Sequence, residues 1–159
     1  MKKTAIYPGT FDPITNGHLD LVERALRIFD EVVIAIAVSQ KKQPLFTVKE
    51  RVEMIKKAIK RFKRAKVDTF NGLLVDYVIK RKGSAILRGL RAVSDYEYEL
   101  QMAHMNRRLN ANIETVFMMT KEEYSFLSSS MVKEVVSFGG SVNGLVPKEV
   151  EVALKKNLG

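Results

Sequence analysis

The sequence predicts an α/β protein in which five parallel strands form one doubly wound sheet, with helices on both of its faces. Strand-like and helix-like stretches alternate along the 159 residues. Repeated alternation of this kind is typical of parallel sheets joined by right-handed helical crossovers. No linker, internal repeat or low-complexity segment interrupts the chain, so we expect a single Rossmann-like domain over residues 1–159.

The expected strands are short apolar runs rich in β-branched residues. The run VVIAIAV at 32–38 is continuous, which is typical of a strand buried on both faces. The expected strands lie at 3–8, 32–38, 66–70, 84–90 and 115–119.

The expected helices carry an apolar face or a capping signal. Leu19, Val22, Leu26 and Phe29 are spaced three and four apart, which predicts a helix over 16–29. TVKE at 47–50 and SDYE at 94–97 have the capping-box pattern, and Gly83 is expected to end a helix. The other helices are expected from the cap at 47 to about 62, and at 73–83, 94–110, 128–139 and 147–157.

Composition narrows the class of protein. The absence of cysteine excludes disulfides and thiolate metal sites and favours the reducing cytoplasm. The first apolar stretch is too short for a signal peptide, and no run approaches the roughly 18 apolar residues of a membrane span. We therefore expect a cytoplasmic protein without a membrane partner.

The net charge of +9 has three interpretations: a nucleic-acid partner, a small polyanionic substrate, or a lysine-rich solvated surface. The densest basic block, KKAIKRFKRAK at 56–66, fits the exposed face of a helix. It contains one aromatic residue, Phe62, whereas single-stranded nucleic acids need aromatic side chains among the basic ones. We expect no nucleic-acid partner, and a basic nucleic-acid-binding module remains a remote alternative.

The stretch YPGTFDPITNGH at 7–18 follows the first expected strand and has the form of a turn with a required shape. Thr15 or Asn16 can cap the next helix, which places Gly17 and His18 in its first turn. Free backbone N–H groups there attract anions, and a glycine lets a phosphate approach closely. His18 adds a ring N–H donor, whereas Asp12 is expected to shape the loop. Neither standard phosphate-loop pattern, G-x-x-x-x-G-K-[ST] or G-x-G-x-x-G, occurs.

Two further stretches follow the fourth and fifth expected strands. In RGLR at 88–91, two arginines flank a Gly-Leu pair, and two guanidinium forks suit two phosphate groups. In SFLSSS at 125–130, three serines precede a helix whose cap needs one hydroxyl, so the surplus favours a second phosphate-binding helix start.

GTFDPITNGH is similar to the T/H-x-G-H motif of the nucleotidyltransferase superfamily, with Thr15 where a first histidine is common. This form resembles the phosphopantetheine adenylyltransferase family. The similarity continues through FTVKERV (46–52), ILRGLRAVSDYEYELQMAHMNR (86–107) and EYSFLSSSMVKEV (123–135).

The resemblance implies transfer of the adenylyl group of ATP to 4′-phosphopantetheine, giving dephospho-coenzyme A and pyrophosphate. It implies Mg²⁺ bound mainly through the ATP phosphates, with no dedicated protein ligands for the metal. The implied catalytic residues are His18, Lys42, Thr10 and Arg91. The implied ATP contacts are Thr10, Phe11, His18, Gly89, Leu90, Arg91, Glu99, Tyr124, Ser125, Phe126, Leu127, Ser128, Ser129 and Ser130. The implied phosphopantetheine contacts are Thr10, Lys42, Leu74 and Arg88.

The helix expected at 94–110 has two apolar stripes, one of which contains Tyr98, Met102, Met105 and Leu109. A helix that is apolar on two sides is buried on two sides, so we expect a subunit contact. The resemblance implies a homo-oligomer, a hexamer built from two trimers, with feedback inhibition by coenzyme A. His104 falls on a polar stripe and is expected to have a structural role.

Two rival enzymes share parts of this pattern. An adenylyl- or cytidylyltransferase with another phosphorylated acceptor would have the same nucleotide site. A class I aminoacyl-tRNA synthetase has the Gly-His signature, but this chain is too short for one and lacks the lysine-rich second signature.

Overall fold

The computed structural model describes residues 1–39, 41, 43–91 and 93–159. It confirms the predicted sheet, which has five parallel strands in the order β3-β2-β1-β4-β5. The strand order reverses between β1 and β4, and such a switch point is where open α/β sheets bind ligands. The strands are β1 Thr4–Gly9, β2 Glu31–Ala37, β3 Ala65–Phe70, β4 Ala85–Leu90 and β5 Glu114–Met119.

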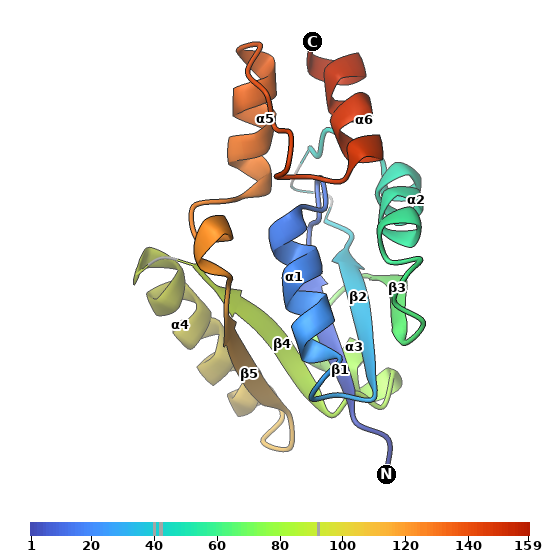
Figure 1. The fold of residues 1–159 in the computed structure, drawn as a ribbon. Coiled ribbons are helices and arrows are strands. Elements are labelled where there is room, and N and C mark those ends of the chain that lie inside the picture. The colour runs from blue at the N-terminus through green and yellow to red at the C-terminus, as the bar shows by residue number, and fades with distance from the viewer. Residues whose placement is uncertain (40, 42, 92) are drawn as a thin grey trace.

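Helices cover both faces of the sheet and extend past its carboxyl edge (Figure 1). α1 crosses the near face, α3 lies behind the sheet, and α5 and α6 stand beyond the carboxyl ends of the strands. The helices are α1 Asn16–Ala25, α2 Val48–Ala58, α3 Leu74–Lys80, α4 Val93–Leu109, the short 3₁₀ helix η1 Glu122–Tyr124, α5 Ser129–Ser137 and α6 Lys148–Leu158.

Two apolar clusters hold these layers together. Alternate residues of β1 point to opposite faces of the sheet, so Ala5 and Tyr7 enter the larger cluster and Ile6 enters the smaller one. The larger cluster also contains Leu21 of α1 and Leu154 of α6, both fully buried. Because β1 is covered on both faces, the turn that follows it starts from a rigid support.

Two helices end earlier than the apolar spacing predicts. α1 ends at Ala25, after which the amide of Ile28 donates to the Ala25 carbonyl over 2.9 Å in a tight turn. α2 ends at Ala58, and the Phe62 amide donates to the Ile59 carbonyl over 2.7 Å. The aromatic side chains beyond these ends still pack on the core, because a tight turn continues in nearly the same direction as the helix.

The predicted role of Gly83 needs correction. α3 ends at Lys80, and the residue in the left-handed region is Lys82, with φ of 52°. Gly83 is required for space instead, because a Cβ there would lie 2.7 Å from Cγ1 of Ile6. The glycine in the sequence located the end of the helix to within three residues. Its role is steric, however, and not the predicted role of ending the helix.

The capping predictions are confirmed at three helix starts. Thr47 accepts from the Glu50 amide over 3.2 Å, and the Glu50 carboxylate accepts from the Thr47 amide over 2.7 Å. Thr15 caps α1, and Ser128 caps α5 by accepting from the Met131 amide over 3.1 Å. The box expected at 94–97 depends on the side chain of Ser94, which lies outside the described part of the structure.

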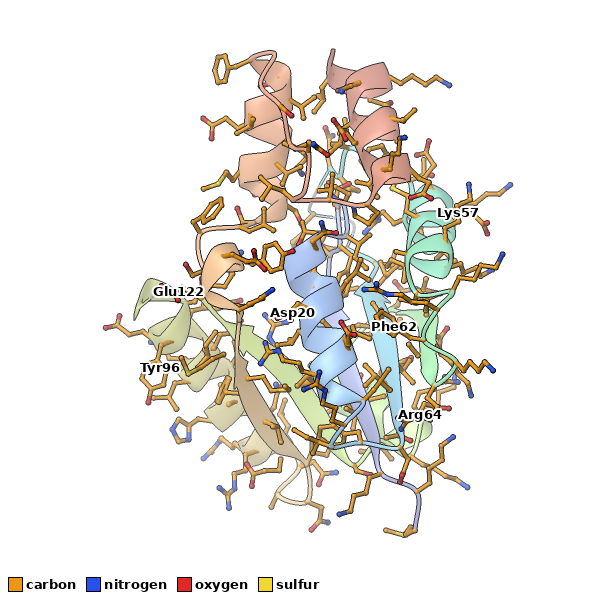
Figure 2. The ribbon with its side chains drawn as sticks, in the orientation of Figure 1. Asp20, Lys57, Phe62, Arg64, Tyr96 and Glu122 are labelled. Carbon is orange, nitrogen blue, oxygen red and sulfur yellow. The ribbon has the colours of Figure 1, made fainter. Side chains whose placement is uncertain are left out.

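The basic block at 56–66 covers the end of α2, the turn after it and the first two residues of β3, so only residues 56–58 lie on a helix as predicted. Lys57 lies on the outer side of α2 (Figure 2), and the lysines of the block are exposed, as the sequence predicts. Among the described residues, no helix is long and apolar enough to cross a bilayer.

Candidate active site

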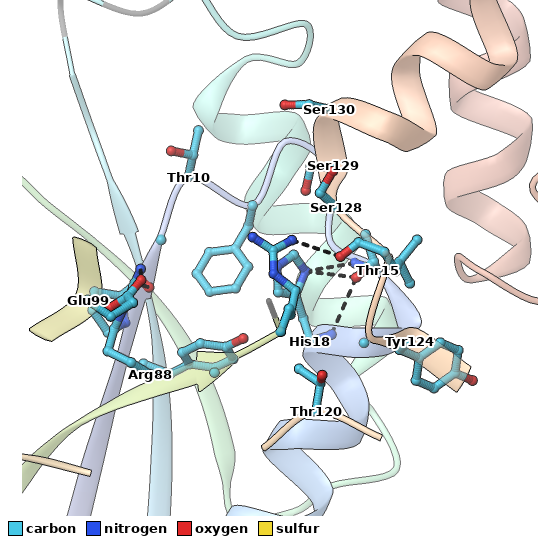
Figure 3. A pocket seen from close by; sticks show the side chains of 18 residues that line it. Thr10, Thr15, His18, Arg88, Glu99, Thr120, Tyr124, Ser128, Ser129 and Ser130 are labelled. Carbon is cyan, nitrogen blue, oxygen red and sulfur yellow. Dashed lines mark hydrogen bonds and ion pairs between the residues drawn. The ribbon is translucent and has the colours of Figure 1, made fainter. Parts of the chain in front are cut away.

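Two cavities open at the carboxyl ends of β1 and β4, the predicted position. The first has a volume of about 260 Å³, and side chains from four separate chain segments surround it (Figure 3). It is lined by Tyr7, Pro8, Gly9, Thr10, Phe11, Thr15, Gly17, His18, Arg88, Gly89, Arg91, Glu99, Thr120, Tyr124, Leu127, Ser128, Ser129 and Ser130.

Asp12 holds the turn after β1 in shape, as predicted. Its buried carboxylate accepts from the Leu45 amide over 2.8 Å, from the Phe46 amide over 2.9 Å and from Nζ of Lys133 over 2.8 Å. Burial alone would raise the pKa of Asp12, but these hydrogen bonds and the Lys133 charge lower it below its ordinary value. Asp12 is therefore a structural anion with all its oxygens engaged, and it is not available as a general base.

A buried arginine fixes the other side of the same turn. Arg51 donates to the carbonyl of Thr10 over 2.8 Å and to the carbonyl of Phe46 over 3.1 Å. The backbone at Thr10 is thus tied to the segment that precedes α2. This tie positions the Thr10 hydroxyl at the cavity wall.

His18 and Thr15 form a capping box in which histidine takes the place usually held by glutamate. The Thr15 hydroxyl accepts from the His18 amide over 3.4 Å, and the Thr15 amide donates to Nδ1 of His18 over 3.0 Å (Figure 3). Because Nδ1 accepts this bond, the neutral ring carries its proton on Nε2. The fold therefore specifies the tautomer of His18.

The ring of His18 is surrounded by groups that disfavour a positive charge on it. Burial, followed by the charges of Arg91 and Arg88, lowers the pKa of His18 to about 3. The Phe11 ring packs against the imidazole with centroids 4.9 Å apart. At neutral pH, His18 consequently acts as a neutral hydrogen-bond donor in the wall of the cavity.

Two helix N-termini converge on this cavity. Gly17 and His18 lie in the first turn of α1, and Ser128 to Ser130 stand at the start of α5. The Ser128 hydroxyl caps α5, and the Ser129 hydroxyl donates to the carbonyl of Pro13 over 2.7 Å. Two helix starts supply unpaired N–H groups and partial positive charge, a combination suited to a polyphosphate.

Arg88 and Glu99 form an ion pair at the inner end of the cavity. Nε of Arg88 donates to Oε2 of Glu99 over 2.7 Å, and Nη2 of Arg88 donates to Oε1 of the same carboxylate. Nη1 donates to the carbonyl of Pro8 over 2.7 Å. Burial opposes the charge on Arg88, but the Glu99 carboxylate more than compensates and raises the pKa of the guanidinium. The cation is thus held in one orientation.

Arg91 joins two edges of the same cavity. Its Nε donates to Asp95 over 2.9 Å, and Nη1 donates to the carbonyl of Leu127 over 2.8 Å. The guanidinium therefore links the end of β4 to the segment that leads into α5. This places a second fixed positive charge beside the helix N-termini.

A second cavity of about 240 Å³ adjoins the first. The two share Pro8, Gly9, Thr10, Arg88 and Glu99 as lining residues. The second cavity is further lined by Ala37, Leu74, Ile86, Tyr98, Met102, Ala103, Asn106 and Thr115. Its wall is largely apolar, whereas two helix N-termini and two arginines line the first cavity, and Arg88 lies at the junction of the two.

Most of the site residues expected from the sequence line these cavities. Thr10, Leu74 and Arg88, which the resemblance assigns to the acceptor, line the second cavity. Three expected ATP contacts, Leu90, Ser125 and Phe126, belong to the adjoining segments but do not line the first cavity. Lys42 lies outside the described residues.

The sequence reasoning missed several lining residues. In the first cavity these include Tyr7 and Thr120, and in the second they include Asn106 and Thr115. Asn106 follows Glu99 by seven residues and so lies on the same face of α4, a spacing that could have revealed it. Among the described residues, no group of three or more His, Asp or Glu side chains could hold a metal ion.

A parallel α/β sheet with a cavity at its switch point, lined by two helix N-termini and two arginines, fits the class of α/β nucleotidyltransferases. The sequence model of the family described as "Cytidylyltransferase-like" matches residues 6–135. A solved structure described as a lipopolysaccharide core biosynthesis protein from Thermoplasma volcanium has the same fold, with a TM-score of 0.57 at 19% identity. It aligns over 76% of this chain and 99% of its own.

Sequence identity to two bacterial relatives is much higher. The chain is 63% identical over 156 residues to the phosphopantetheine adenylyltransferase of Thermodesulfovibrio yellowstonii, covering 98% of this chain and 97% of that protein. It is 56% identical over 153 residues to the protein of the same name from Geobacter sulfurreducens, covering 96% and 93%. The chain belongs to the cytidylyltransferase-like family and, within it, to the phosphopantetheine adenylyltransferases.

Proposed function

We propose that this protein transfers the adenylyl group of ATP to 4′-phosphopantetheine, giving dephospho-coenzyme A and pyrophosphate. The observation that carries the proposal is the junction of the two cavities at Arg88. One compartment suits a nucleotide triphosphate and the other an elongated, largely apolar acceptor. An acceptor whose phosphate lies at Arg88 would face the nucleotide directly.

ATP is assigned to the first cavity. Its phosphates would lie over the N-termini of α1 and α5, within reach of His18 and Arg91. Gly17 lies in the first turn of α1 and lines this cavity, which is consistent with this placement.

Phosphopantetheine is assigned to the second cavity. Leu74, Ile86 and Met102 offer an apolar wall for the pantetheine arm, and the Arg88 fork suits the phosphate at its end. Lys42 is proposed as a further contact with this phosphate, and this proposal rests only on the resemblance to the phosphopantetheine adenylyltransferase family.

The reaction needs positioning and charge neutralisation rather than a base. An oxygen of the acceptor phosphate, already ionised near neutral pH, attacks the α-phosphorus of ATP, and the bond to the β,γ-pyrophosphate breaks as pyrophosphate leaves. Two anions must approach one another, so fixed positive charges and donors supply most of the stabilisation. Nε2–H of His18, the Thr10 hydroxyl and the two arginines are arranged for this task.

Magnesium is proposed to enter with ATP. Glu99, a carboxylate in the cavity, is engaged by Arg88, so phosphate oxygens and water would supply most of the metal's ligands. When bound, the ion would neutralise charge on the phosphates.

A homo-oligomer is proposed from the surface of α4. Tyr98, Met105 and Leu109 are at least half exposed and lie on one side of the helix, next to the edge strand β5. Such a face favours self-association. The hexamer of two trimers, and feedback inhibition by coenzyme A, are proposed on the resemblance.

The decisive experiment measures pyrophosphate release from ATP with each of several acceptors. Release that depends on phosphopantetheine supports the proposal. Release with a mononucleotide or a phosphorylated sugar alcohol, but not with phosphopantetheine, would assign the protein to the sister transferases. Tight binding of DNA or RNA in moderate salt, without any transfer, would favour the nucleic-acid-binding alternative.

A further inference from the structure

Tyr7 has a buried phenol that the proposed mechanism does not use. The residue lies in β1, one position before the shared wall of the two cavities, and only 6% of its surface is exposed. It lines the first cavity. Among the described residues, no hydrogen bond to its hydroxyl is present, and no buried side-chain polar atom lacks a partner. The hydroxyl is therefore open to the cavity.

The comparison with Tyr77 shows what a structural tyrosine does in this fold. Tyr77 is 8% exposed, and its hydroxyl donates to the carboxylate of Asp68 over 2.9 Å. Buried tyrosine hydroxyls normally find such a partner, because an unpaired one costs free energy. Packing alone would be satisfied by phenylalanine at position 7, so the hydroxyl needs another explanation.

The surroundings of the Tyr7 ring hold it in place. Its ring meets the Phe11 ring edge-on, with centroids 5.2 Å apart, and lies 6.2 Å from the ring of His18. Burial raises the pKa of the Tyr7 phenol above its ordinary value, and the positive charges of Arg88 and Arg91 oppose this rise only in part. The group thus remains a protonated donor at working pH, between His18 and the cavity junction.

We infer that the Tyr7 hydroxyl donates a hydrogen bond to the α-phosphate of the bound nucleotide. This inference rests on the proposed assignment of a nucleotide to the first cavity. The α-phosphate must lie at the cavity junction for the acceptor at Arg88 to reach it. Tyr7 and His18 together then provide two neutral donors, preorganised by ring packing and by the capping box. Both aim at the group whose charge is redistributed in the transition state.

Tyr7→Phe tests the inference, because it removes the oxygen and keeps the ring. A hydrogen bond to a charged group is worth roughly a 10- to 100-fold rate difference. We expect kcat for pyrophosphate release to fall by that factor, with the KM for phosphopantetheine and the melting temperature nearly unchanged. The matched control is Tyr77→Phe, a buried tyrosine outside both cavities, for which kcat should stay at the wild-type value.

Unchanged kcat and KM values in Tyr7→Phe would overturn the inference while leaving the transferase function intact. The opposite case, in which the nucleotide contact is right and the proposed acceptor is wrong, is also measurable. Wild-type protein that binds ATP but does not use phosphopantetheine would refute the acceptor. A weaker affinity of Tyr7→Phe for ATP alone, measured by calorimetry, would then still support the nucleotide contact.

A second measurement avoids substitution altogether. In protein labelled with ¹³C at tyrosine Cζ, the Tyr7 resonance should shift when ATP is added, and the Tyr77 resonance should not. A Tyr7 resonance that ignores saturating ATP would overturn the inference even if the variant did not fold.

Discussion

The backbone N–H of Thr15 donates a hydrogen bond to Nδ1 of His18 over 3.0 Å, so the histidine presents its opposite ring nitrogen, with its proton, to the first cavity. The same contact starts α1, since the Thr15 hydroxyl accepts from the His18 amide in return. The T-x-G-H motif of this chain is thus a helix cap and a tautomer lock at once.

His18→Ala should lower kcat by about 10²–10³, the usual scale for the loss of one preorganised donor. The Thr15 hydroxyl can still cap the helix, so circular dichroism should report an intact fold. His104→Ala, an exposed histidine on α4, is the control and should retain full activity. A wild-type turnover number in His18→Ala would mean that another group stabilises the transition state.

The low pKa of His18 makes stability depend on pH in a defined direction. The folded-state pKa is about 3 and the ordinary value is 6.5, so the unfolded chain binds the extra proton between these values. His18 therefore imposes no stability cost above pH 6.5 and destabilises the fold progressively as pH falls toward 3. Urea unfolding at pH 7 and at pH 4.5 should show a larger loss for wild type than for His18→Gln. Equal losses would contradict the lowered pKa.

Gly17→Ala separates the needs of the fold from those of the ligand. A Cβ at this position would lie 3.5 Å from the nearest protein atoms, an ordinary contact, and alanine suits a helix better than glycine. The melting temperature should hold or rise. ATP affinity measured by calorimetry should fall about tenfold or more, because the methyl group would lie against Tyr124 and Leu127 in the wall of the cavity where the phosphates are proposed to bind. Wild-type affinity would place the phosphates elsewhere.

Arg88→Ala should mainly raise the KM for phosphopantetheine, by about tenfold or more, since a bidentate contact to a phosphate is lost. The KM for ATP should change much less. If ATP affinity alone moved, the assignment of Arg88 and Arg91 to the two substrates would be reversed.

Glu99→Gln provides the companion measurement, because it keeps the shape of the side chain and removes the charge that orients Arg88. We expect the same substrate to be affected as in Arg88→Ala, with a smaller change. A double-mutant cycle for the pair should show non-additive effects on the phosphopantetheine KM. Additive effects would indicate that Glu99 acts independently of Arg88.

Much of the fold was predictable because its signals are local. The continuous apolar run of β2, the box at Thr47 and the serine before α5 each depend on neighbours within a few residues. Helix ends were less predictable: the spacing of Phe29 and Phe62 continues past α1 and α2, although the backbone has already left the helix. Gly83 shows the same limit, since its requirement for space comes from Ile6, 77 positions earlier in the chain.

The same distinction between local and long-range relationships applies to the residues of the candidate site. The turn at Thr15–His18, where phosphate is proposed to bind, could be predicted from the residues alone, because glycine, the cap and His18 act through the backbone of one helical turn. The contact of Glu99 with Arg88 and the opening of the Tyr7 hydroxyl into the cavity became visible only in the folded chain. These relationships depend on which strands are neighbours and on what burial does to a charge or a hydroxyl, and neither is encoded in local spacing.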